Sequence, residues 1–68
     1  MESTFIGYDA GGLTTDSERC TFIGAEAGNA LNYSGENNTA IGFDAEPSAV
    51  AIDDEFTLGN SNIGTLRC

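Results

Sequence analysis

The stretch TFIGYDAG (residues 4–11) decides the fold of this chain, because it recurs. It returns as TFIGAEAG (21–28) and as TAIGFDAE (39–46), and a degenerate fourth copy, FTLG, spans residues 56–59. The glycines that mark the copies are Gly7, Gly24, Gly42 and Gly59, which gives spacings of 17, 18 and 17 residues. A fixed period is the sequence signature of a repeat architecture.

Each copy opens with β-branched and aromatic residues and continues with a glycine, which is typical of a short strand that ends in a bend. The stretches between copies, such as NYSGENN (32–38), carry turn residues. Residues 46–55 contain a short apolar run without a helical period, so an extended segment is predicted there. Pairing of equivalent strands about 4.8 Å apart would stack the copies, with glycines at the corners.

Alternation divides the side chains of the first copy between two faces, one with Thr4, Ile6, Tyr8 and Ala10 and the other with Phe5, Gly7 and Asp9. Both faces carry apolar groups, and such strands are normally buried on both faces. Since 68 residues hide little surface, we expect one face to pack inside the chain and the other against another copy of it. The predicted fold class is all-β, a trimeric β-helical or β-solenoid fibre built from 17–18-residue repeats. The residues expected to carry the repeat are Gly7, Gly24, Gly42, Gly59, Ile6, Ile23, Ile41, Leu58, Phe5 and Phe22.

The charge balance is strongly acidic, with eleven Asp and Glu against two arginines and a net charge of −9. Phosphate contacts need clustered Lys and Arg, so no nucleic-acid partner is predicted. The charge repels anionic membranes, and no apolar run approaches the roughly 18 residues that span a bilayer. A hydrophobic fraction of 40%, placed periodically, argues against disorder.

Catalytic and metal-binding signals are missing from the sequence. There is no histidine, no GxSxG motif and no phosphate loop, and no unique acidic pair stands out for glycoside cleavage, so no enzyme and no cofactor are predicted. Cys20 and Cys68 lack zinc-site spacing. We expect two thiols rather than a disulfide, because Cys68 is terminal and free thiols are typical of a reducing cytosol.

Asp9, Glu26 and Asp44 occupy one repeat position, for which a solvated outer face is expected. The alternative is that three chains converge these carboxylates on calcium or magnesium. The run at residues 53–55, Asp-Asp-Glu, lacks EF-hand spacing and is expected to be an exposed corner.

The repeat-registered aromatic residues are expected to pack in the core or at an interface, and sugar stacking is the alternative. They are Phe5, Tyr8, Phe22, Phe43 and Phe56. Tyr33, which lies in a polar turn, is the better candidate for an exposed contact.

The stretch GENNTAIGFDA (35–45) resembles the repeat of phage tail-fibre shafts and of trimeric autotransporter adhesin heads, two trimeric and β-rich families. The resemblance covers the chain from Ser3 to about Ala45 in three copies and continues more loosely beyond. The third copy departs from the pattern at Ala40, which replaces Phe, and at Glu46 and Pro47, which replace a glycine-led turn. A local change of path or strand pairing stays open there.

The last segment, FTLGNSNIGTLRC (56–68), is similar to the stretch that leads into the C-terminal intramolecular chaperone of phage tail fibres and spikes. In those proteins the chaperone drives trimerisation and is then cut off. The resemblance implies a repetitive β-fibre shaft at 1–55 and a degenerate C-terminal repeat at 56–68, leading to a chaperone domain that this sequence does not contain.

The implied function is a structural module of a homotrimeric phage tail fibre, a stiff shaft or tip for host attachment, located in the virion after assembly in the host cytoplasm. Its implied partners are two further copies and a host-cell surface receptor, with carbohydrate among the candidates. The alternatives are the head of a trimeric autotransporter adhesin and a fibre tip that binds or cleaves carbohydrate. Both a triple β-helix and three separate β-rolls satisfy the repeat.

Overall fold

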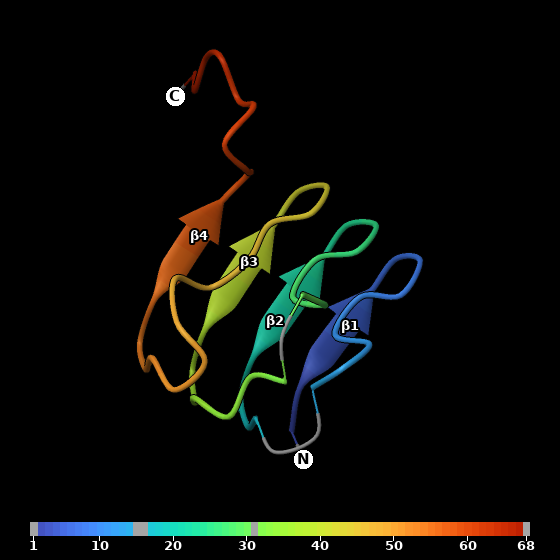
Figure 1. The fold of residues 1–68 in the computed structure, drawn as a ribbon, viewed down its shortest axis with the longest axis vertical. Helices are drawn as coiled ribbons and strands as arrows, with labels where there is room; N and C mark the ends of the chain where they lie inside the picture. Colours follow the sequence, from blue (N-terminus) through green and yellow to red (C-terminus); the bar gives the residue numbers. More distant parts are fainter. Residues whose placement is uncertain (1, 15–16, 31, 68) are drawn as a thin grey trace.

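The computed structural model describes residues 2–14, 17–30 and 32–67. Its secondary structure is one parallel sheet of short strands, β1 (Thr4–Ile6), β2 (Thr21–Ile23), β3 (Thr39–Ile41) and β4 (Phe56–Leu58), in the order of the sequence (Figure 1). The all-β prediction agrees with this sheet. The described ranges contain no helix that could cross a membrane.

Each strand pairs with its equivalent in the next copy, as predicted. Thr4 lies opposite Thr21, Phe22 opposite Ala40, and Ile41 opposite Leu58. The hydrogen bonds continue beyond the strands, since the Glu26 N–H donates to the Tyr8 carbonyl at 2.7 Å and the Asp44 N–H to the Ala25 carbonyl at 2.9 Å. Ala40 therefore causes no change of strand pairing, and the third copy stays in register.

The central residue of each strand points inward and builds a narrow core. Phe22 and Ala40 are fully buried, and the Phe5 ring stacks on the Phe22 ring with centroids 5.2 Å apart and planes 8° from parallel. Cys20, just before β2, and Ala27 and Ala45, in the turns that follow β2 and β3, complete the cluster. The core is therefore a column to which each copy contributes the central residue of its strand.

The alternation predicted for the first copy is correct within β1 and wrong after it. Ala10 was assigned to the face of Ile6, but its equivalents Ala27 and Ala45 are buried in the core. Asp9 was assigned to the face of Phe5, but it is exposed. The reason is that the strand ends at Ile6 and the chain bends at Gly7, where a period of two no longer applies.

Residues 46–55 are not the predicted extended segment. The chain bends at Ser48 and Ala49 and turns at Val50 and Ala51 before it reaches β4. The apolar run is short, and its first three residues are exposed, so no core contact holds it in one straight strand.

Three glycines at the ends of β1, β2 and β3 allow the copies to approach closely. Gly7, Gly24 and Gly42 have φ of 129°, 128° and 124°, a backbone region that residues with a side chain rarely adopt. A Cβ atom on Gly7 would lie 2.6 Å from the Gly24 carbonyl, and one on Gly24 would lie 2.6 Å from the Gly42 carbonyl oxygen. These glycines therefore form a column in which the backbone of the next copy leaves no room for a side chain.

Gly24→Ala is expected to destabilise the fold strongly. A methyl group there meets backbone rather than a flexible side chain, and the positive φ alone costs roughly 1–3 kcal/mol. The measurement is urea unfolding followed by far-UV circular dichroism at a fixed chain concentration. Gly64→Ala is the matched control, because a Cβ there meets nothing within 4 Å. Equal stability of the two variants would contradict this account of the glycine column.

Candidate interaction surface

The outward side chains of the four strands form an apolar row on the solvent face of the sheet. This outer column consists of Ile6, Ile23, Ile41 and Leu58, which stand opposite one another in the strand register. Ile6 is 57% exposed, Ile41 36% and Leu58 50%, while Ile23, in the middle, is half-buried. One face of the sheet thus packs inside the chain, and the other presents aliphatic side chains to the surroundings.

The repeat-registered aromatic residues divide between the core and the surface. Phe5 and Phe22 lie in the core, whereas Tyr8, Phe43 and Phe56 are exposed. Tyr8 and Phe43 follow the glycine of their copies by one residue, and Phe56 opens β4. Three of these five rings are therefore on the surface, and one of them, Phe56, belongs to a strand.

A groove extends the outer column at its β4 end. Its walls are Ile41 and Leu58 on the sheet, and Ile63 and Leu66 on the segment that follows β4. Ile63 and Leu66 are 54% and 66% exposed. The apolar surface thus continues from the strands onto the last described residues of the chain.

The acidic repeat position has a backbone role that the sequence analysis missed. Asp9, Glu26 and Asp44 have φ of 57°, 61° and 56°, the left-handed conformation. Aspartate tolerates this conformation better than most residues. Asp9 and Asp44 are exposed, as expected, and Glu26 is half-buried. The sequence signal for this turn was an acidic residue that recurs two positions after the glycine of each copy.

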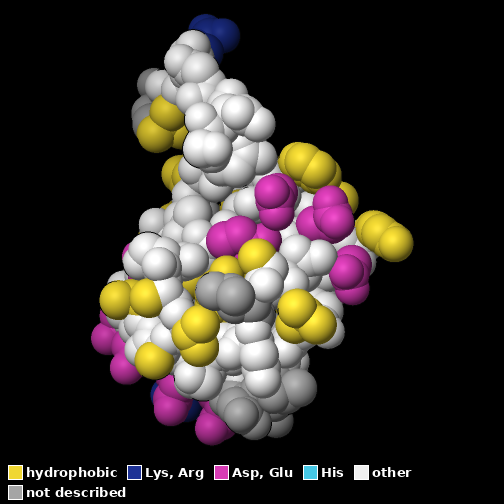
Figure 2. Space-filling model, viewed as in Figure 1, with side chains coloured by type: hydrophobic (Ala, Val, Ile, Leu, Met, Phe, Trp, Pro, Cys, Tyr) yellow, Lys and Arg dark blue, Asp and Glu magenta, His cyan; other side chains and the backbone are white. Residues whose placement is uncertain are grey.

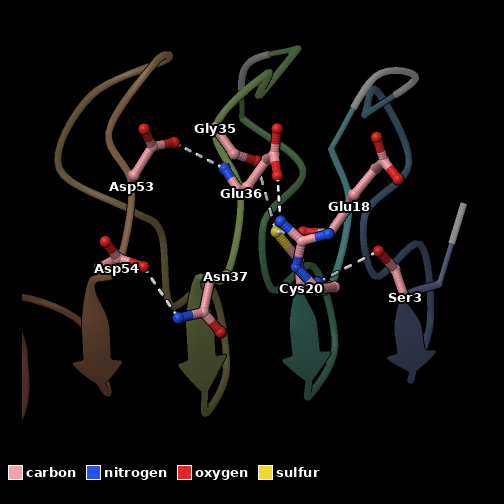
Figure 3. Close-up of polar contacts among 9 residues, drawn as sticks. Ser3, Glu18, Cys20, Gly35, Glu36, Asn37, Asp53 and Asp54 are labelled. Atoms are coloured by element: carbon pink, nitrogen blue, oxygen red, sulfur yellow. Dashed lines mark hydrogen bonds and ion pairs between the residues drawn. The ribbon is translucent and has the colours of Figure 1, made fainter.

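Polar side chains also join the copies just before the strands (Figure 3). The Asn37 side-chain amide donates to Asp54 Oδ1 at 2.8 Å, and the Glu36 N–H donates to Asp53 Oδ1 at 2.8 Å. Arg19 forms an ion pair with Glu36 in the same region. Asp53 and Asp54 are exposed, as predicted for this corner, whereas Glu55 is half-buried. The carboxylates of Asp53 and Asp54 also tie the third copy to the second.

Tyr33 is buried, so its predicted exposed contact is wrong. Its side chain is 1% exposed, and its ring meets the Phe22 ring edge-on with centroids 6.2 Å apart. The Tyr33 hydroxyl donates to Glu46 Oε1 at 2.9 Å, and the Ala30 N–H donates to the same oxygen at 3.2 Å. Glu46, which replaces the glycine of the earlier copies, therefore supplies the acceptor that a buried phenol requires.

The environment shifts the ionisation of these groups in different directions. Burial raises the pKa of Glu46, opposed by the hydrogen bonds from Tyr33 and Ala30, and Glu46 Oε2 is buried with no partner among the described residues. Burial, together with the bond to Glu46, raises the pKa of Tyr33. Hydrogen bonds from the hydroxyl and N–H of Ser48 lower the pKa of Glu55.

Groups that could bind a metal ion or react as a thiol are few among the described residues. Within the described ranges, no three Asp, Glu or Cys side chains come together in a way that could hold a metal ion. Cys20 is a buried thiol whose Sγ lies 3.5 Å from the Glu18 carbonyl and 3.6 Å from that of Gly35. The prediction for Cys68 falls outside the described residues.

Comparison with family models, with curated proteins and with solved structures finds no match for this chain.

Glu46→Gln is expected to stabilise the chain at pH 7 and to leave it unchanged in acid. A carboxyl whose pKa is raised by folding supports the fold below its ordinary value of about 4.5 and loses that support as the pH rises through the folded value. Glutamine keeps the acceptor for Tyr33 and Ala30 without the charge. The measurement is the free energy of unfolding from pH 3 to pH 8.

Glu55→Gln is the matched control with the opposite sign. Because folding lowers the pKa of Glu55, its contribution is present above the ordinary value and is lost as the pH falls, so this variant is expected to be less stable at pH 7. A shift of the same sign in both variants would contradict the assignment of the two environments.

Proposed function

We propose that this chain is a structural module of a homotrimeric phage tail fibre, a virion component that assembles in the host cytoplasm and forms a stiff shaft or tip for host attachment. The observation that carries the proposal is the outer column. A folded single chain leaves Ile6, Ile41 and Leu58 in contact with water, and apolar surface of this kind marks an interaction site.

In the β-solenoid that we propose, bonds between successive copies account for stiffness. Copies are joined by backbone hydrogen bonds in the strands and also in the turns, where the Gly11 N–H donates to the Ala27 carbonyl and the Gly28 N–H to the Ala45 carbonyl, both at 2.8 Å. In such an array each repeat contacts its neighbours in sequence, and stability is approximately a sum over repeats and their interfaces. Further copies can stack in the same way, so such an array lengthens along one direction.

We propose three separate β-rolls rather than a triple β-helix. Separate rolls keep the pairing of β2 with β1 and β3 that the single chain forms, whereas an intertwined helix would take the neighbours of a strand from other chains. Each chain thus pairs its two inner strands by itself, while the outer face of its sheet stays exposed. A closed ring of identical chains covers that face with one repeated contact.

The purified chain is expected to have the solution mass of a trimer, and Ile41→Asp is expected to lower it. A charge in the outer column removes apolar burial worth roughly 1.5–3 kcal/mol per chain and adds like-charge repulsion at the contact. Light scattering gives the mass, and far-UV circular dichroism checks that the β spectrum persists. Val50→Asp is the matched control, since Val50 is 41% exposed but lies on a turn. A monomeric wild-type chain with a β spectrum would reject the trimer.

Salt is expected to strengthen the trimer. Three chains of net charge −9 carry −27, so repulsion between them opposes association. Raising the ionic strength from about 0.01 M to about 1 M shortens the screening length from roughly 30 Å to roughly 3 Å and reduces that repulsion. Sedimentation at several chain concentrations measures the dissociation constant, which should fall as sodium chloride is added. A constant that does not change with salt would contradict an association limited by charge.

A further inference from the structure

The segment that follows β4, residues 60–67, leaves the sheet and projects beyond the ends of the strands (Figure 1). This terminal segment combines two exposed apolar side chains, Ile63 and Leu66, with Arg67. Figure 2 shows a basic side chain at its tip and acidic side chains gathered on the body of the molecule. Its composition is thus complementary to the surface that the strands and their turns present.

Arg67 is one of only two basic residues in the chain. The other, Arg19, is paired with Glu36, and this is the one ion pair among the described residues. Arg67 is exposed at the end of a segment that carries no acidic side chain of its own. Among the described residues, Arg67 is thus the arginine that forms no ion pair within the chain.

The terminal segment is long enough to touch a neighbouring chain. It begins with a turn, in which the Ile63 N–H donates to the Asn60 carbonyl at 3.2 Å, and the four residues after this turn span up to roughly 13 Å when extended, at about 3.3 Å each. The segment also forms one wall of the groove that continues the outer column, so an occupant of that groove would touch both the column and the segment.

We propose that in the trimer the terminal segment of each chain docks on the outer face of the next chain, with Leu66 against that chain's outer column and Arg67 paired with its Asp44. This proposal rests on the proposed trimer and adds an exchange of segments between its chains. Three such contacts close into a ring, since each chain both donates a segment and receives one.

Asp44 is the acid of the repeat position that lies nearest in height to the departure of the segment. It follows β3, the neighbour of β4, whereas Glu26 and Asp9 follow β2 and β1. When three chains are related by an axis along the stacking direction, equivalent residues share one height. A segment that leaves β4 of one chain therefore meets Asp44 of the next chain before it meets the other two acids.

A double-mutant cycle between Arg67→Gln and Asp44→Asn tests the ion pair. The dissociation constant of the trimer is measured by sedimentation for the wild type, the two single variants and the double variant. A surface pair contributes about threefold per contact, so each single variant should weaken the trimer and the double variant should be no weaker than Arg67→Gln alone. Asparagine is the replacement of choice because it tolerates the left-handed backbone at this position.

Asp9→Asn is the matched control, because Asp9 occupies the same repeat position and the same backbone conformation at the far end of the sheet. Combined with Arg67→Gln, it should show additive effects. Coupling of Arg67 to Asp9 and not to Asp44 would overturn the assigned position. Additivity with both acids would overturn the ion pair.

Isotope-filtered NMR on trimers reassembled from carbon-13-labelled and unlabelled chains tests the contact directly. Docking predicts nuclear Overhauser effects between the Leu66 methyl groups of one chain and the Ile23 or Ile41 methyl groups of another. A trimer that shows none of these intermolecular effects overturns the docking of the segment and leaves the trimer intact. A monomeric wild-type chain overturns the trimer itself, and the docking with it.

Discussion

The close approach of equivalent backbones at Gly7, Gly24 and Gly42 is the constraint on which the rest of the structure depends. At each of these glycines the carbonyl or Cα of the next copy leaves no room for a side chain. The hydrogen bonds between neighbouring strands depend on this short distance between the two backbones. The left-handed turn at the acidic position then returns the chain towards the core, where Ala27 and Ala45 pack beneath Phe22. A single larger side chain in the glycine column would separate two copies and weaken every contact between them.

The core that results is narrow, and its narrowness explains the surface. Cys20, Phe22, Ala40 and two turn alanines fill the inner side of the sheet, and Phe5 and Tyr33 pack against Phe22. The aliphatic residues on the other side of the sheet are exposed or half-buried. A chain of this size hides little surface in any case. The association that we propose follows from the strand geometry, because the inner face of the sheet is covered by the chain itself and the outer face presents exposed aliphatic residues.

The sequence was sufficient for the strands and their register, because four glycines at nearly constant spacing mark equivalent positions. It also indicated the outer column, since Ile6, Ile23, Ile41 and Leu58 alternate with the inward residues. The turns were harder to predict. Tyr33 lies among polar residues in the sequence, yet its burial depends on Glu46, which is distant in sequence and replaces a glycine. The alternation failed at Asp9 and Ala10, because a bend ends the period of two.

The second copy is one residue longer than its neighbours, yet β2 and β3 remain in register. The additional residue is accommodated between the turn after Ala27 and the bridge between Glu18 and Glu36, outside the strands. Height along the stack is consequently independent of the number of residues in a loop, at about 4.8 Å for each copy. An array of this kind measures length in repeats, and its loops are free to lengthen and to vary without changing that length.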